Sequence, residues 1–519
     1  MQQRLPATPQ AFQTYFERTG STCVDFSAYQ GRERKTLFDM LNKKLLWKKG
    51  DFVTTPYVYK VEKEIARRVI EHRDSESKFP KVSYSQVSEM IKEYEKLEGE
   101  RLNVDFHLAP EQAEAVHKAL NAQVFVLTGG PGTGKTCVLK CIQYVLKSVK
   151  PDAHIVFTAP TGKAARRITE STGEPACTIH KKMSLISETS KPYPIFCDCI
   201  IVDEISMLDT LTADAFFMAV QLGAKILLVG DVDQLPSVGY GSVLRDLLQS
   251  NQLECEGLRA PQRQDSKSDL LQNITNLRYG QPELFQGDDF SFVDANEENG
   301  KDVLLEEYFK AVDKWGIENV CCLTPYRRKG SSCANVINDI IQSKVNPPEK
   351  KRHITTWITE DDDEKSTSTS RQITFVEGDP VIQLVNRAEI ANGDVGKVTK
   401  IDGNHMDVLY EGDIIVTYNT YEMNQLNLAY AMSVHKSQGS EYKCVVTSAL
   451  PEHKQLLCRN MLYTAVTRAK KDCVLVCDKE TVEAGLKVQA GYERDTLLRE
   501  LIEHEGRKAN LLKSLQKLA

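Results

Sequence analysis

Short apolar runs alternate along this chain with longer stretches in which apolar residues recur every three or four positions. The clearest pair is Val124–Leu127, typical of a buried strand, followed by residues 138–149 with apolar side chains at a helical period. The next strand-like runs are Ile155–Phe157, Cys199–Val202 and Ile226–Val229. Strands that alternate with helices predict a parallel sheet covered by helices, an α/β fold.

A second series of strand-like runs predicts a second α/β domain. Its members are Val320–Leu323, Val445–Thr447 and Val474–Val476. Between them, residues 372–427 show short alternating strands with Gly-Asp turns, which favours a small inserted β-barrel. Residues 358–372 are acidic and then rich in Ser and Thr, and we expect a flexible loop there.

The ends of the chain carry no motif of their own. Tyr57–His72 has apolar positions at a helical period, so the N-terminal region is expected to be mainly helical. The predicted boundaries are 1–105 for this helical domain, 106–280 for the first α/β domain, 281–371 for the start of the second, 372–427 for the barrel, 428–480 for the remainder of the second α/β domain and 481–519 for a C-terminal helical tail.

A glycine-rich loop joins the strand at Val124–Leu127 to the helix after it. It consists of Gly129, Gly130, Pro131, Gly132, Thr133, Gly134, Lys135 and Thr136. In this context the G-x4-G-K-T spacing predicts a phosphate-binding loop, because glycines let backbone amides turn toward a polyphosphate at a helix N-terminus. Lys135 would then reach the β and γ phosphates, and the Thr136 hydroxyl would ligate Mg²⁺. The sequence therefore predicts a site for a nucleoside triphosphate.

Two further strand ends carry polar side chains suited to phosphoryl transfer. Asp203 and Glu204 follow Cys199–Val202, so the first can hold Mg²⁺ and the second can orient or deprotonate the attacking water. Gln234 follows Ile226–Val229 at a position where it can sense the γ-phosphate.

Composition changes this picture little. The 519 residues carry a net charge of −6, which does not exclude nucleic acid because a protein can hold one strand in a channel through local basic and polar groups. We expect the fourteen cysteines to be reduced, because several lie inside strand-like runs. No apolar stretch approaches the roughly 20 residues of a membrane span, and no signal-peptide core follows the N-terminus. We therefore expect no membrane association and a cytoplasmic or nuclear, non-secreted protein.

Seven motifs occur in a fixed order between residues 108 and 478. They are GGPGTGKT, APTGKAARR, TIH, VDEISM, GDVDQLPSVGYGS, VHKSQGSEY and YTAVTRAKK. This series resembles the motif set of superfamily-1 DNA helicases of the RecD-like branch. The resemblance implies two RecA-like motor domains, a duplex-splitting pin hairpin at about 184–196, and ATP with Mg²⁺ as cofactors.

The resemblance also implies roles for individual residues around the nucleotide. Gln112 matches the glutamine that reads adenine, Arg263 an arginine near the γ-phosphate, and Arg468 the arginine finger. A guanidinium that reaches the γ-phosphate from a second domain stabilises the transition state only when the cleft closes, which couples hydrolysis to movement. Further nucleotide contacts are implied at Gln438, Gly439 and Glu441.

The implied DNA contacts are hydroxyls, amides and basic groups that grip phosphates without reading bases. They are Pro160, Thr161, Lys163, Thr178, His180, Tyr326, Arg327, His435, Lys436 and Ser437. The segment available for the pin is short compared with that of the family.

The leading hypothesis is an ATP-dependent DNA helicase that moves 5′ to 3′ on single strands, with the polarity taken from the family. Its partners would be single-stranded and forked DNA, with room for a protein partner at residues 1–105 or at the tail. Two alternatives stay open: an RNA helicase of the same superfamily, and a DNA-stimulated ATPase that remodels or recruits without separating strands. The sequence does not indicate which of repair, replication or recombination the motor serves.

Overall fold

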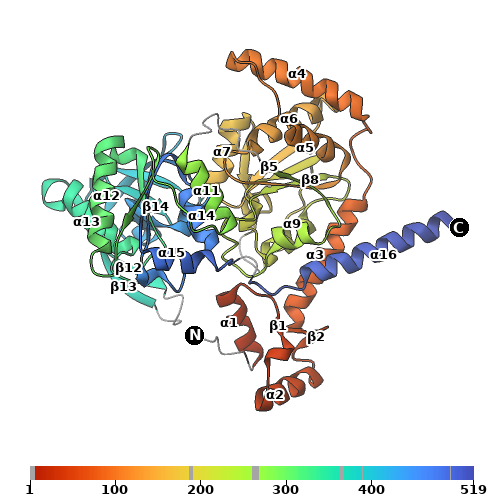
Figure 1. The fold of residues 1–519 in the computed structure, drawn as a ribbon, viewed down its shortest axis with the longest axis horizontal. Coiled ribbons are helices and arrows are strands. Elements are labelled where there is room, and N and C mark those ends of the chain that lie inside the picture. The colour runs from red at the N-terminus through yellow and green to blue at the C-terminus, as the bar shows by residue number, and fades with distance from the viewer. Residues whose placement is uncertain are drawn as a thin grey trace. The chain divides into compact units, whose positions relative to one another are not determined.

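The computed structural model describes residues 6, 8–185, 191–259, 268–361, 368–387, 390–490 and 493–518 (Figure 1). The chain divides into two compact units. Unit 1 comprises Met1–Pro160, Ala164–Gln264 and Ala490–Ala519, and unit 2 comprises Thr161–Lys163 and Asp265–Gln489. The division at Gln264 differs from the boundary expected at residue 280, and the last thirty residues return to unit 1 rather than forming a separate tail.

Unit 1 is built on a six-stranded sheet in which every pairing is parallel, as the alternating pattern predicted. Its order is β6 (Ala176–Thr178), β5 (Ile155–Ala159), β7 (Cys199–Val202), β8 (Lys225–Gly230), β4 (Val124–Gly129) and β9 (Glu254–Leu258). The helices of this part are α5 (Pro110–Asn121), α6 (Lys135–Val149), α7 (Gly162–Thr172), α8 (Ile179–Lys182), α9 (Thr210–Ala219) and α10 (Val243–Gln249). The carboxyl ends of β4, β7 and β8 therefore lie along one edge of the sheet.

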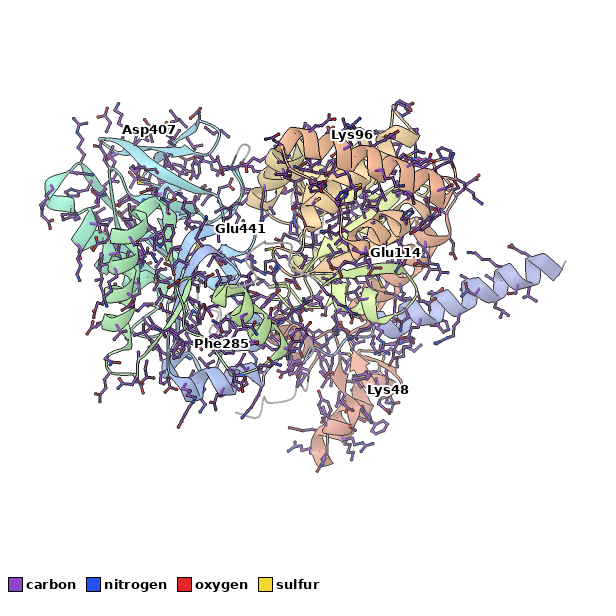
Figure 2. All side chains as sticks on the ribbon, turned by 45° about the horizontal axis from the view of Figure 1, so that its top comes forward. Lys48, Lys96, Glu114, Phe285, Asp407 and Glu441 are labelled. Carbon is purple, nitrogen blue, oxygen red and sulfur yellow. The ribbon has the colours of Figure 1, made fainter. Side chains whose placement is uncertain are left out.

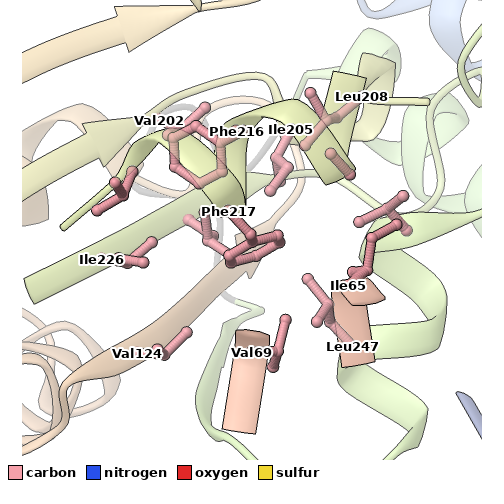
Figure 3. Packing of buried hydrophobic residues seen from close by; sticks show 14 of the residues in the cluster. Ile65, Val69, Val124, Val202, Ile205, Leu208, Phe216, Phe217, Ile226 and Leu247 are labelled. Carbon is pink, nitrogen blue, oxygen red and sulfur yellow. The ribbon is translucent and has the colours of Figure 1, made fainter. Parts of the chain in front are cut away.

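The two faces of this sheet bury separate apolar clusters, because successive side chains of a strand point to opposite faces. On β4, Val124 and Val126 belong to one cluster, whereas Phe125 and Leu127 belong to the other. Figure 3 shows the first cluster, in which Ile65 and Val69 pack with Phe217 of α9. The inner strands β4, β7 and β8 are buried along almost their whole length, and burial on both faces explains their nearly continuous apolar runs.

The N-terminal region adds helices and a small sheet to unit 1. The helices are α1 (Pro9–Thr19), α2 (Gly31–Asn42), α3 (Pro56–Asp74) and α4 (Tyr84–Leu102). The expected helix at 57–72 is α3. An antiparallel sheet of β1 (Val24–Asp25), β3 (Phe52–Thr54) and β2 (Trp47–Lys49) accompanies them. The last helix of the chain, α16 (Leu498–Leu518), packs along α3 (Figure 1).

Glu62 is fully buried on α3 and accepts a hydrogen bond of 2.7 Å from the Thr22 hydroxyl. Burial raises the pKa of Glu62 to about 8, against about 4.3 in an unfolded chain. The folded protein thus holds a proton that the unfolded chain releases, so this group lowers stability as pH rises from about 4.3 to 8.

We expect Glu62→Gln to raise the apparent melting temperature at pH 8 by about 3 °C or more, because the amide stays neutral. The gain should shrink toward pH 5. Thermal melts monitored by circular dichroism across this range test it. Glu64→Gln is the control, because ion pairs with Arg67 and Arg68 lower the pKa of Glu64; it should not gain stability. An equal gain in both variants would contradict the assignment.

Unit 2 contains a five-stranded sheet, also parallel throughout. Its order is β10 (Phe290–Asp294), β21 (Ala469–Cys477), β20 (Tyr442–Ala449), β11 (Val320–Thr324) and β19 (Ala431–Ser433). The helices are α11 (Asp269–Tyr279), α12 (Gly300–Trp315), α13 (Ala334–Val345), α14 (Arg459–Val466) and α15 (Lys479–Leu486). The second α/β domain predicted from the sequence is present.

The β-rich region within unit 2 is antiparallel. One sheet has the order β17 (Ile414–Asn419), β16 (His405–Tyr410), β15 (Val395–Asp402), β14 (Pro380–Gln383) and β18 (Leu426–Leu428). Within the described chain the pairings end at β17 and β18, without a pair between them.

The prediction of a flexible loop at 358–372 is wrong for the residues that the structure describes there, because they lie in strands. Residues 358–361 and 368–372 belong to β12 (His353–Asp361) and β13 (Ser368–Val376), which pair in continuous antiparallel register from His353 opposite Val376 to Asp361 opposite Ser368. Thr residues suit strands even where they are polar, so composition alone was misleading.

All fourteen cysteines are free thiols. In the part of the chain that the structure describes, no helix is long and apolar enough to cross a membrane.

Candidate nucleotide and nucleic-acid site

The glycine-rich loop lies at the carboxyl end of β4 and leads directly into α6. Gly132 and Gly134 have φ angles of 73° and 85°, a left-handed conformation that favours glycine. The Lys135 ammonium donates to the Gly129 and Gly130 carbonyls at 2.6 and 2.9 Å, and the Thr136 side chain is exposed. Amides, ammonium and hydroxyl thus gather at the positive end of a helix, where a polyphosphate is favoured.

Gln112 is buried beside this loop and uses both ends of its amide on backbone atoms. Its nitrogen donates to the Thr133 carbonyl at 2.9 Å, and its oxygen accepts from the Ala109 amide at 2.9 Å. The side chain therefore joins the start of α5 to the phosphate loop. Its role in reading adenine stays a prediction.

Asp203 and Glu204 follow β7 at the same edge of the sheet. Burial, together with the neighbouring Glu204 charge, raises the pKa of Asp203 to about 6, while the Lys135 ammonium acts in the opposite direction. The Glu204 amide donates to the Asp203 carboxylate at 2.8 Å, and Glu204 has a φ of 54°. A non-glycine residue in the left-handed region is strained, and such strain concentrates at functional sites. Two neighbouring carboxylates, one of them with a raised pKa, would be stabilised by a bound cation.

The described residues contain no group of three or more His, Cys, Asp or Glu side chains arranged to hold a metal ion. Mg²⁺ usually keeps several waters and binds through one or two carboxylates plus substrate phosphates. Thr136 and Asp203 therefore fit such an ion, and they are the residues that would hold it.

Gln234 lies in the polar loop at residues 231–242, which follows β8. Its side-chain nitrogen lies 3.3 Å from the Asp231 carboxylate, and Asp231 also accepts from the Asp233 amide at 3.1 Å. The Gln234 side chain is buried. The strand before the loop, β8, lies between β7 and β4 in the sheet. The loop therefore follows a strand that lies between those carrying the phosphate loop and the acidic pair. The role of Gln234 as a sensor stays a prediction.

Arg494 donates hydrogen bonds to the 231–242 loop. The sequence analysis did not predict a role for this arginine. Its guanidinium donates to the carbonyls of Ser237, Gly239 and Gly241 at 2.7 to 3.1 Å. Burial lowers the pKa of Arg494 to about 10. The Gly241 amide also donates to the Gly20 carbonyl at 2.7 Å. Two distant segments of the chain therefore support this loop.

We expect Arg494→Ala to loosen the 231–242 loop, because three carbonyls lose their donor at a cost of about 1–3 kcal/mol each where they stay buried. Hydrogen exchange of the loop amides should rise by about tenfold or more. Arg499→Ala is the control, since Arg499 lies on the same segment but pairs with Glu503 in an exposed position. Equal exchange in the two variants would show that the loop does not depend on Arg494.

Arg468, in unit 2, is 3% exposed and bonded to protein atoms. Its Nε donates to the Thr464 carbonyl at 3.1 Å, and NH1 donates to the Ser440 carbonyl at 3.2 Å. Ser440 lies between Gly439 and Glu441, so the two motifs that carry the predicted nucleotide contacts of unit 2 are linked. Gln438 is buried beside them, and Glu441, labelled in Figure 2, pairs with Lys470 at 3.0 Å.

Two predicted DNA contacts of unit 2 are close enough to repel each other. Burial and the Arg327 charge lower the pKa of Lys436. Lys436 donates to the Asn392 side chain at 2.9 Å, while Ser437 and His435 share its 3-10 helix η6 (Val434–Ser437). A phosphate group close to both cations would relieve this repulsion.

The loop that carries Tyr326 and Arg327 is anchored within unit 2. Glu452 accepts from the Ser331 and Ser332 amides at 2.8 and 3.0 Å. The Ala334 amide donates to the Tyr326 carbonyl at 3.0 Å. Such anchoring holds the backbone of the two predicted contacts in one conformation.

The other predicted DNA contacts follow strands or begin helices of the first α/β domain. Pro160, Thr161 and Lys163 lie after β5 at the start of α7. Thr178 accepts from the Lys181 amide at 3.2 Å and so caps α8, which contains His180. Their contact with DNA stays a prediction.

Two predictions fall wholly or partly outside the described residues. Arg263 is one. Of the pin at 184–196, only 184–185 and 191–196 are described, and these residues form no strand pair with each other. Instead, Ile195 bridges to Val220 beside α9, while Tyr193 and Phe196 are 67% and 64% exposed. Pro192 and Pro194 lack the amides that a hairpin ladder needs, so the pin remains a prediction only for its central residues.

Comparison with known proteins agrees with the order of the motifs. Residues 112–240 match the model of an AAA domain, and residues 428–476 match that of the UvrD-like helicase C-terminal domain. The ATP-dependent RecD2 DNA helicase of Deinococcus radiodurans is 32% identical over 371 residues, which cover 70% of this chain and 48% of that protein. The chain thus spans about half the length of this relative.

Two further similarities involve a helicase subunit and a solved structure. The RecBCD enzyme subunit RecD of Mycolicibacterium smegmatis is 27% identical over 426 residues, 73% of each chain. The Pif1 helicase from Bacteroides, in complex with ADP-AlF3 and single-stranded DNA, is 20% identical with a TM-score of 0.46, over 72% of this chain and 92% of that chain. From the ordered motifs, the two matched domains and these relatives by sequence, the chain belongs to the RecD-like branch of the superfamily-1 helicases.

Proposed function

We propose that this chain is an ATP-dependent DNA helicase that translocates 5′ to 3′ on single-stranded DNA and separates duplex ahead of it. The observation that supports this most strongly is the convergence of Lys135, Thr136 and the Asp203–Glu204 pair at one edge of a parallel sheet. The relatives named as DNA helicase and as RecD point to the same activity.

The residues of unit 1 would divide the chemistry among them. Lys135 would neutralise the β and γ phosphates, and Thr136 with Asp203 would hold Mg²⁺, which when bound offsets the negative charge of the phosphates. Glu204 would orient the attacking water and accept its proton. Gln234 would respond to the γ-phosphate, and its loop would pass that response to the segments that hold it.

Unit 2 would supply Arg468, and Arg263 is a second candidate arginine. Charge builds up on the γ-phosphate in the transition state, and a guanidinium that arrives during closure stabilises it. The Lys436–Arg327 neighbourhood would grip a phosphate of the tracked strand. Each hydrolysis would then change the grip on DNA, which is how a helicase of this design moves.

Partners and location follow from the same proposal. Single-stranded and forked DNA would be substrates, and a protein could bind residues 1–105 or the last residues, as the name of the RecBCD subunit suggests for that relative. The protein would act in the cytoplasm, or in the nucleus of a eukaryotic cell.

The test is ATP hydrolysis measured without nucleic acid, with a single-stranded DNA and with RNA of the same sequence. We expect strong stimulation by DNA and little by RNA. Equal or greater stimulation by RNA would favour the RNA helicase, and no stimulation by either would contradict a nucleic-acid motor.

A further inference from the structure

Six exposed side chains in the N-terminal part of unit 1 form a surface that the motor does not use. They lie on α2, on β2 and in the turn between them. Figure 2 labels Lys48, which belongs to β2. We name them the basic–aromatic surface, which consists of Arg34, Phe38, Lys43, Lys44, Trp47 and Lys48. Phe38 and Trp47 are 48% and 46% exposed, so two large rings face solvent beside the four cations.

Contacts with one ring bring the two elements together. The Arg34 guanidinium and the Lys48 ammonium lie 5.0 and 5.2 Å from the centre of the Phe26 ring. Phe38 meets the same ring edge-on at 5.1 Å. Phe26 itself is buried, so Arg34, Phe38 and Lys48 lie around one ring. Trp47 precedes Lys48 on β2 and points to the opposite face of the strand, but β2 is the edge strand of its sheet, so both side chains border the same edge.

The charge of this region is opposite to that of the whole chain. Residues 31–50 contain seven Lys or Arg and two acidic residues, whereas the chain has a net charge of −6. The structure gives the four cations of the surface no ion pair with any described residue. On the adjacent α3, by contrast, Arg67, Arg68 and Arg73 are all paired with acids. Unpaired cations attract an anionic polymer and release its counterions.

Trp47 adds a flat apolar group to these charges. Its ring stacks on Tyr59 with centroids 5.1 Å apart and an angle of 26° between the planes, yet nearly half of it faces solvent. A ring held in this way loses little freedom when a second flat group stacks on it. Exposed aromatic rings beside basic groups are the combination that binds single strands, because phosphates and unpaired bases are satisfied together.

We propose that the basic–aromatic surface binds single-stranded DNA outside the motor. Arg34 and the three lysines contact phosphates, and a base stacks on Trp47. The choice of DNA over RNA rests on the proposed function, whereas the binding chemistry rests on the surface alone. The surface would hold part of the strand while the motor works on another part.

A first test uses the fluorescence of Trp47. The chain has three tryptophans, so Trp315→Phe with Trp357→Phe leaves Trp47 as the only reporter. Titration with an oligothymidylate should quench its emission in a saturable way that weakens with salt. This result is expected even if the chain neither hydrolyses ATP nor unwinds DNA, so the two proposals fail separately. Unchanged emission at saturating DNA would overturn the stacking.

A second test removes charge from the surface. The variant Lys43→Gln, Lys44→Gln and Lys48→Gln should bind a long oligothymidylate about tenfold more weakly at low salt. Its slope of log affinity against log salt should fall by about 2, since each phosphate contact on a single strand contributes about 0.7. Hydrolysis of ATP without DNA should be unchanged.

The control removes the same charge elsewhere in unit 1. Lys81→Gln, Lys92→Gln and Lys96→Gln alter exposed lysines on α4 and just before it, and affinity and slope should stay near those of the parent. Equal losses in the two triple variants would show a general charge effect and overturn the site. Stronger dependence of duplex than of single-strand binding on the surface lysines would overturn its assignment to single strands.

Discussion

Replacement of Lys135 by alanine is expected to abolish ATP hydrolysis and leave the fold and single-strand binding largely intact. Among the described residues, the ammonium donates to two carbonyls of its own loop, Gly129 and Gly130, and to no core group. Its loss removes the positive charge that would face the γ-phosphate in the transition state. Steady-state hydrolysis with saturating DNA, with a thermal melt on the same sample, measures both effects.

Lys140→Ala is the matched control, because it removes the same charge from the same helix five residues further on. It should retain parental turnover. If Lys135→Ala keeps more than about a tenth of the parental rate, the role given to this lysine is wrong.

Arg468→Ala should lower turnover by about a hundredfold or more and leave nucleotide affinity near normal. A finger acts in the transition state rather than in the ground state, so its loss appears in kcat. Binding of a fluorescent ADP and steady-state hydrolysis separate the two quantities. Lys471→Ala, three residues away and exposed, is the control for local charge.

The buried position of Arg468 requires a second variant. Because the side chain bonds to Thr464 and Ser440, alanine can also disturb the fold of unit 2. Arg468→Lys keeps a charge but cannot make the same forked bonds. We expect it to fold normally and remain far below parental turnover. A change of nucleotide affinity alone, with turnover preserved, would remove the finger assignment.

Much of the motor could be predicted from the sequence because its strands are strongly apolar and its motifs follow them directly. Cys199–Val202 is a strand, and Asp203 and Glu204 lie at its carboxyl end, as expected from the pattern. The phosphate loop was recognisable for the same reason. Local signals of this kind survive in any arrangement of the rest of the chain.

Features that depend on long-range packing could not be predicted. Arg494 lies in a segment without a motif, and only folding brings it to the 231–242 loop. The facing ends of β12 and β13 are rich in Thr, Ser and charged residues, a composition that resembles a loop until the register is known. β1, β2 and β3 have two or three residues each, too few to show an alternation.

Strand separation on oligonucleotide forks tests the central proposal most directly. Duplexes with a 5′ tail, with a 3′ tail and with blunt ends are incubated with ATP and Mg²⁺, with Lys135→Ala as the inactive control. The account predicts displacement only from substrates with a 5′ single-stranded tail, only with ATP, and none by the variant. Hydrolysis stimulated by DNA without displacement from any of these substrates, or displacement that requires a 3′ tail, would contradict it.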